Sequence, residues 1–148
     1  MSDIVYIGQD DPEIRLFESQ YKVPDGMCYN SYVILDDKIA VMDTSDQRTV
    51  ASWKESLAKA LGGRKPDYLV VHHLEPDHAG GIAEFLALYP GAKVVCSARA
   101  AQMMPQFFPS TDFSANVIPV KEGDTLSLGR HTLRFFMAPM VHWPEVMV

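Results

Sequence analysis

The chain has 148 residues, the length of one domain, and 47% of them are hydrophobic while 22% are charged, as in an ordinary globular protein. A formal net charge of −6 and the lack of a basic stripe argue against nucleic acid or an anionic membrane as a partner. No apolar run approaches the roughly 18–20 residues that span a bilayer, and the first residues do not resemble a signal peptide. We therefore expect a cytoplasmic protein whose two distant cysteines, Cys28 and Cys96, are reduced thiols.

The first part of the chain is predicted to form a β-hairpin followed by a helix. Residues 4–8 and 31–35 are β-rich, and residues 38–44 follow a turn-like Asp-Asp pair, so the last two segments should pair. From about Gln47 to Leu61 apolar residues recur at helical spacing, and two glycines then end the helix.

The middle of the chain alternates between predicted strands and helices. Residues 67–72 form a nearly continuous apolar run, typical of a strand that is covered on both faces. Further segments are a helix over 79–91, a strand over 92–98, a helix over 99–108 broken near Pro105, and β-structure in 116–120, 124–129 and 131–140. This order indicates a mixed α/β sandwich more than a purely parallel Rossmann sheet, and neither GxGxxG nor a Walker A motif is present.

Four residues with ligand-type side chains, His73, Glu75, Asp77 and His78, follow the strand predicted over 67–72. Ligand sites of α/β folds lie at the carboxyl ends of strands, and alternate residues of an extended segment project to one side. Pro76 is expected to keep the segment extended, and the two glycines that follow let the backbone turn closely. These residues are a candidate ligand set for one or two transition metals.

The types of ligand narrow the choice of metal. Imidazole with several carboxylates and no thiolate suits iron, manganese or zinc more than copper(I). Glu75 adds negative charge, which favours iron in higher oxidation states. The alternative is a polar turn whose carboxylates cap a helix starting near Ala79, with Asp77 well placed to do so; four such residues together favour the metal site.

The other histidines differ in what they suggest. His142 follows a predicted strand and is flanked by Pro139, Trp143 and Pro144, which indicate a stiff turn, so it could complete a set with His73 and Glu75. His131 begins a strand among polar residues and is expected to face solvent. His72 should point away from His73 and could at most support a ligand.

Three separate segments resemble the flavodiiron proteins. "HLEPDHAG" (residues 73–80) has the H-x-E-x-D-H form of the metallo-β-lactamase-fold signature. The hydrolases of that fold carry histidine where this chain has Glu75. "DGMCYNSYVILDDKIAVMDT" is similar to that family's N-terminal hairpin, and "APMVHWPEVM" to its segment around the next ligand histidine.

The resemblance implies an α/β (α+β) fold, a metallo-β-lactamase-like αββα sandwich. Residues 1–148 would form its di-iron domain, incomplete at the C-terminus and holding little more than the first half. It implies an oxidoreductase that reduces O2 to water or NO to N2O at a non-haem di-iron site. FMN would be carried by a separate flavodoxin-like domain or a partner, and electrons would come from a flavoprotein or a rubredoxin-like protein.

The same resemblance implies the roles of individual residues. His73, Glu75 and His142 would bind one iron, and Asp77 and His78 the other. Asp43 would lie near the site, although a role as an ordinary turn residue is an equal alternative. Because the first set offers three ligands and the second only two, one metal should bind more tightly than the other.

The family pattern continues beyond Val148 with a bridging aspartate and a final histidine. The chain is therefore expected to be a fragment, one half of a split protein, or a remnant that forms a homodimer to cover its open face. Two other functions stay open: a non-catalytic di-iron sensor of O2 or NO, and a metal-dependent hydrolase, against which Glu75 argues.

Overall fold

A six-stranded mixed sheet forms the centre of the molecule, with the strand order β1-β6-β7-β8-β9-β10. The computed structural model describes residues 3–148. The antiparallel half consists of β1 (Ile4–Tyr6), β6 (Tyr32–Ile34) and β7 (Ala40–Met42), and the predicted hairpin is confirmed by the pairing of β6 with β7. β7 also starts the parallel half, which continues through β8 (Tyr68–Val71), β9 (Lys93–Ser97) and β10 (Val117–Val120). The sheet is thus mixed, as expected.

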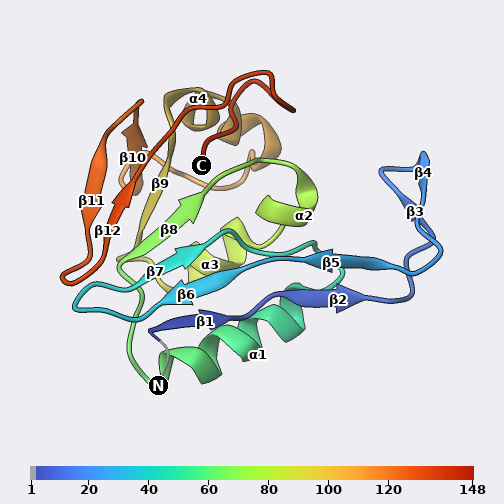
Figure 1. Cartoon of the computed structure of the whole chain (residues 1–148), viewed down its shortest axis with the longest axis horizontal. Helices are drawn as coiled ribbons and strands as arrows, with labels where there is room; N and C mark the ends of the chain where they lie inside the picture. The colour runs from blue at the N-terminus through green and yellow to red at the C-terminus, as the bar shows by residue number, and fades with distance from the viewer. Residues whose placement is uncertain (1–2) are drawn as a thin grey trace.

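Three two-stranded ribbons lie outside this sheet. Two of them precede β6; the residue pattern predicted none of their strands, although residues 27–29 lie inside the segment that resembles the family's N-terminal hairpin. Their strands are β2 (Gln9–Asp11) with β5 (Met27–Tyr29), and β3 (Leu16–Phe17) with β4 (Tyr21–Lys22), whereas β11 (Thr125–Ser127) and β12 (Thr132–Arg134) form the third. The ribbon of β3 and β4 projects beyond the end of the sheet (Figure 1).

One face of the sheet is covered by helices. They are α1 (Val50–Leu61), α3 (Ile82–Leu88) and α4 (Ala98–Phe107), while the short α2 (Pro76–Ala79) lies beyond the end of β8 (Figure 1). Trp53, Leu57 and Phe85 are fully buried against the sheet. Pro105 lies inside α4, so the expected break there was wrong; the helix ends two residues later, and the lost backbone bond affects only its last turn.

The second face of the sheet is covered only in part. The ribbon of β11 and β12 and the last residues pack on β8 to β10 through Leu128, Phe135 and Met147, which are buried. Toward β1 and β6 this face carries Tyr6 and Tyr32, which are 49% and 40% exposed and contact each other edge to face. Within residues 3–148 no helix is long and apolar enough to cross a membrane.

His131 does not simply face solvent, so that expectation was wrong. Its backbone N–H and its ring Nδ1 both lie 2.7 Å from Oδ2 of Asp36, a buried carboxylate in the turn between β6 and β7. The amide of Asp37 donates to the other oxygen at 2.8 Å. Burial alone would raise the pKa of Asp36, but these hydrogen bonds outweigh it and hold the pKa well below its usual range.

We predict that Asp36 makes stability depend on pH in the acid range. Its pKa is lower in the folded chain than the value of about 3.9 of an unfolded aspartate, so the stabilisation is complete at neutral pH, begins to fall below about pH 4 and is fully lost only below the folded-state pKa. Asp36→Asn should therefore lower the melting temperature at pH 7 and lower it by less at pH 3. The exposed Asp37→Asn is the control; an equal deficit of Asp36→Asn at both pH values would contradict the prediction.

Candidate metal centre

The site begins where β8 leaves the sheet. His72 to Glu75 follow Val71, and Glu75 still has extended backbone angles (φ −59°, ψ 143°). The expectation that Pro76 keeps Glu75 out of a helix is thus confirmed, but the extended segment does not continue to Asp77, because Pro76 starts α2. Proline is favoured in the first turn of a helix because its missing N–H would have no partner there. Asp77 and His78 are therefore helical residues, and neither caps a helix through its side chain.

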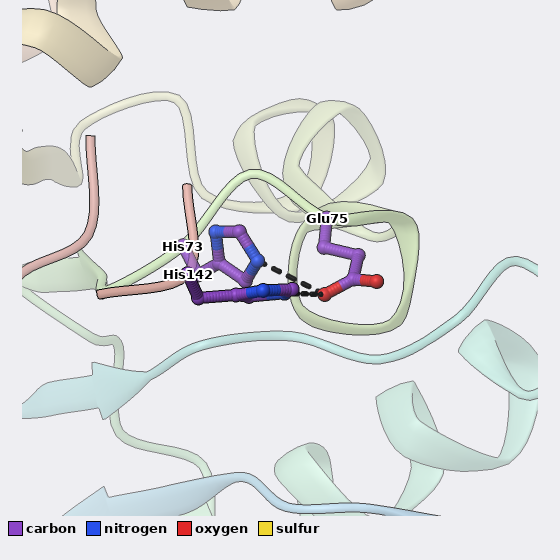
Figure 2. A group of neighbouring side chains, drawn as sticks. All are labelled: His73, Glu75 and His142. Atoms are coloured by element: carbon purple, nitrogen blue, oxygen red, sulfur yellow. Dashed lines mark hydrogen bonds and ion pairs between the residues drawn. The ribbon is translucent and has the colours of Figure 1, made fainter. Parts of the chain in front are cut away.

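Three of the predicted ligands converge on one point. Nε2 of His73 and Nε2 of His142 each lie 2.9 Å from the same carboxylate oxygen, Oε2 of Glu75. One ligand atom from each residue lies within 4.8 Å of the others, and both imidazoles point at the carboxylate (Figure 2). His73 and Glu75 are buried, whereas the side chain of His142 is 56% exposed. This arrangement is open on the His142 side.

A fold-back of the last residues brings His142 to the site. The expected strand over 131–140 ends at Arg134, and the chain then turns so that Phe136 and Val148 exchange two backbone hydrogen bonds. The amide of Met147 donates to the carbonyl of His72 at 3.1 Å, which fixes this segment against the end of β8. The ring of Trp143 stands perpendicular to that of His73, with centroids 5.0 Å apart.

Asp43 holds the second half of the site. This buried residue follows β7 with a left-handed backbone (φ 55°), and its carboxylate accepts from the amide of His72 at 2.8 Å. Oδ2 lies 3.2 Å from Nδ1 of His72 and 2.9 Å from Nδ1 of His78. Burial would raise the pKa of Asp43, but the two imidazoles hold it well below its usual range. Burial opposes charge on His78 as well, yet Asp43 raises the pKa of His78 to about 9.

Asp77 and His78 lie beside the group of three without joining it. Nε2 of His78 is 3.6 Å from Oδ2 of Asp77, and its ring centroid is 5.4 Å from that of His73. Burial raises the pKa of Asp77, and the attraction of His78 only partly offsets this. All five predicted residues are thus neighbours, but they divide into sets of three and two.

The buried oxygens of this site fit a cation. Oε1 of Glu75 and Oδ1 of Asp77 are both buried without a hydrogen-bond partner among the described residues. Buried polar atoms normally have partners, and an ionised carboxylate can be satisfied only by a donor or a positive charge. Burial would raise the pKa of Glu75, but its hydrogen bonds with His142 and His73, together with the neighbouring Glu18 side chain, lower it, so its carboxylate is held ionised.

Two residues beside the site were missed from the sequence. Glu18, in the turn between β3 and β4, lies beside Glu75, and the neighbouring Glu75 carboxylate raises the pKa of Glu18. Glu145, in the C-terminal fold-back, lies 2.7 Å from Nδ1 of His73. Glu18 had no local signal, because it lies in a polar turn; Glu145 could have been noticed as a lone acid within the apolar "EVMV".

Gly80 positions α2 through a close backbone approach. A Cβ atom there would lie 2.7 Å from the carbonyl oxygen of Ser45 and 2.8 Å from the amide nitrogen of Gln47. The side-chain amide of Gln47 also donates to the carbonyl of Gly80 at 2.7 Å. Gly80 itself has an ordinary right-handed helical backbone (φ −55°, ψ −28°), so the glycine serves this close approach and not a special turn. The contact ties the helix of Asp77 and His78 to the segment after β7.

We predict that Gly80→Ala destabilises the fold and displaces α2, because the new methyl group meets backbone atoms that cannot move aside. The loss should be about 1–3 kcal/mol, as for overpacked sites, measured by urea unfolding. Gly91→Ala is the matched control, because a Cβ atom there meets nothing within 4 Å. Equal stability of the two variants would contradict the prediction.

Comparison with known protein families gives a match over most of the chain. The family described as ODP family beta lactamase matches residues 27–148. A nitric oxide reductase of Moorella thermoacetica is 37% identical over 145 residues, which cover 97% of this chain and 36% of the relative. An anaerobic nitric oxide reductase flavorubredoxin of Aeromonas hydrophila is 35% identical, over 99% of this chain and 30% of its own length.

Solved structures of similar proteins share the fold. Rubredoxin oxygen:oxidoreductase from Desulfovibrio gigas superimposes with a TM-score of 0.92 at 33% identity, covering 99% of this chain and 36% of that structure. The flavodiiron protein from Giardia intestinalis gives a TM-score of 0.90 at 27% identity, covering 98% and 35%. The chain thus spans about a third of the length of the relatives that it matches.

Proposed function

This chain belongs to the ODP family of beta lactamases and has the metallo-β-lactamase-like fold of flavodiiron proteins, and we propose that it provides the iron-binding part of an O2 or NO reductase. The observation that carries the proposal is the convergence of His73 and His142 on Glu75, whose second oxygen is buried without a partner. The names of the relatives, a nitric oxide reductase and a rubredoxin oxygen:oxidoreductase, support the type of reaction.

In this proposal His73, Glu75 and His142 hold one iron, and Asp77 and His78 contribute to a second. Bound iron would supply a redox-active centre that passes electrons to O2 or NO. The chain's own part is to hold the ligands: Asp43 fixes the ring of His78 through Nδ1, which leaves Nε2 toward Asp77. Two carboxylates add negative charge next to the metals, which stabilises their oxidised form.

We propose that electrons come from FMN on a separate domain or partner, reduced in turn by a flavoprotein or a rubredoxin-like protein. The names flavorubredoxin and rubredoxin oxygen:oxidoreductase of two similar proteins support this type of donor. Residues 1–148 would then be the first part of the metal-binding domain. The cytoplasm remains the proposed location; Cys28 and Cys96 are both free thiols, as in a reducing compartment.

The uncovered face of the sheet suits a further piece of the same kind of domain. Exposed Tyr6 and Tyr32 lie next to a hollow whose lining reaches Asp43, His72 and His78. A cover on this face would bury apolar surface and could bring further ligands to Asp77 and His78. We propose the second half of a metallo-β-lactamase-like domain as this cover, with a homodimer as the alternative.

We predict that the chain binds one Fe²⁺ more tightly than a second under anaerobic conditions, because one set offers three ligands and the other two. Stepwise titration against a chromophoric chelator measures both affinities. Retention of no iron would count against the proposal, and two equal, tight sites would show that ligands come from residues outside this set.

We also predict that His142→Ala weakens the tighter site by at least about 10- to 100-fold, the range seen when only an outer partner of a ligand is lost. His131→Ala is the control, because it removes an imidazole at the Asp36 contact, away from the site. It should lower stability and leave iron affinity unchanged. Equal loss of affinity in both variants would mean that stability alone governs binding.

Turnover of O2 or NO by iron-loaded protein with a reduced flavoprotein would distinguish a reductase from a sensor.

A further inference from the structure

Glu145 is a fully buried carboxylate placed behind a predicted ligand. Its side chain has no exposed surface, and Oε1 lies 2.7 Å from Nδ1 of His73. The other ring nitrogen, Nε2, faces Glu75 at 2.9 Å. The imidazole is therefore held between two carboxylates, with Glu145 on the side that faces away from the group of three. Glu145 cannot be a ligand of the same metal, because the ring of His73 separates it from that group.

Glu145 is held in place by hydrogen bonds to both its side-chain carboxylate and its backbone carbonyl. Oε1 also accepts the amide N–H of Leu74 at 3.0 Å. The carbonyl of Glu145 accepts from Oγ of Ser97 at 2.7 Å, and the same Oγ caps α4 by accepting the amide of Ala100 at 3.0 Å. The start of α4 and the end of β8 thus hold Glu145 in one orientation.

Satisfying the amide of Leu74 does not by itself require this residue. A neutral oxygen would serve a backbone amide, whereas a buried charged carboxylate is costly unless it has a strong partner. Both contacts are made by Oε1, while Oε2 is buried with no partner among the described residues. Besides the Leu74 amide, the group that this oxygen contacts is the imidazole of His73.

A neutral imidazole carries its hydrogen on only one ring nitrogen, and the nitrogen that binds a metal must be free of it. Oε2 of Glu75 is also contacted by His142, so it can be satisfied without His73. We infer that Glu145 is a positioning residue that keeps the hydrogen of His73 on Nδ1 and so directs the lone pair of Nε2 to the metal. This inference rests on the proposed metal centre and adds a residue that holds one of its ligands.

The tautomer of His73 can be read from two-bond ¹H–¹⁵N spectra of the ¹⁵N-histidine-labelled full chain. We expect the hydrogen on Nδ1 in the metal-free protein and in the Zn²⁺-loaded protein. In Glu145→Ala the remaining carboxylate contact is on Nε2, so the hydrogen should move there in the metal-free state. Zn²⁺ affinity should fall about 10- to 100-fold, as for other lost ligand partners.

Two further variants separate positioning from general loosening. In Glu145→Gln the Leu74 amide still needs an acceptor, so the amide oxygen should stay in place, keep the hydrogen on Nδ1 and restore most of the Zn²⁺ affinity. Glu122→Gln is the matched control: Glu122 accepts the amide of Met137 in the same C-terminal fold-back at 2.7 Å but does not touch His73. It should change neither the tautomer nor the affinity.

The outcomes distinguish this inference from the proposed function. If wild type binds Zn²⁺ and Glu145→Ala keeps both the Nδ1 hydrogen and the affinity, the inference is overturned while the metal centre stands. If wild type binds no Zn²⁺, the metal centre fails and the inference fails with it, although the tautomer still reports whether Glu145 orients the ring. Should Glu145→Ala not fold, Glu145→Asp withdraws the carboxylate from Nδ1 and must give the same shift of the hydrogen.

Discussion

The parallel register of β7, β8 and β9 aligns three strand ends at one edge of the sheet, and each end supplies a group that organises the site. Met42 is paired with Val70, and Val71 with Cys96, so Asp43, His72 and Ser97 come next along their strands at the same edge. Asp43 accepts the amide of His72 and holds His78, while Ser97 caps α4 and holds the backbone of Glu145. Without this register the side chains of distant segments would not meet.

The main elements and the candidate ligands could be predicted because their signals are local. The helix of α1 follows from apolar spacing, and the site follows from five ligand-type residues at two strand ends. Both preferences of proline are realised at Pro76: Glu75 before it keeps the extended backbone that was expected, while Pro76 itself starts α2, so the extended segment ends before Asp77. The contacts of His131 with Asp36 and of Glu145 with His73 join residues 95 and 72 positions apart, and no local pattern reports such distances.

The two halves of the site differ in how their charges are balanced. The buried charge of Asp43 is compensated within the chain, because it faces His72 and His78 and raises the pKa of both. Glu75 and Asp77 each keep one buried oxygen without a partner in the described part of the chain. The negative charge that is left for a cation is therefore concentrated at Glu75 and Asp77, and Asp43 acts as an internal counter-charge that holds an imidazole in place.

The C-terminal fold-back that carries His142 and Glu145 also has a meaning for the order of folding. These residues meet Glu75 and His73 across 67 and 72 positions of chain, so their contacts form only after a long loop has closed, at an entropic cost that local contacts do not bear. A metal that binds His73, Glu75 and His142 would join both ends of that loop and act as a reversible cross-link. Supply of the metal would then govern how long residues 135–148 stay docked, and with them the exposure of this segment to proteases.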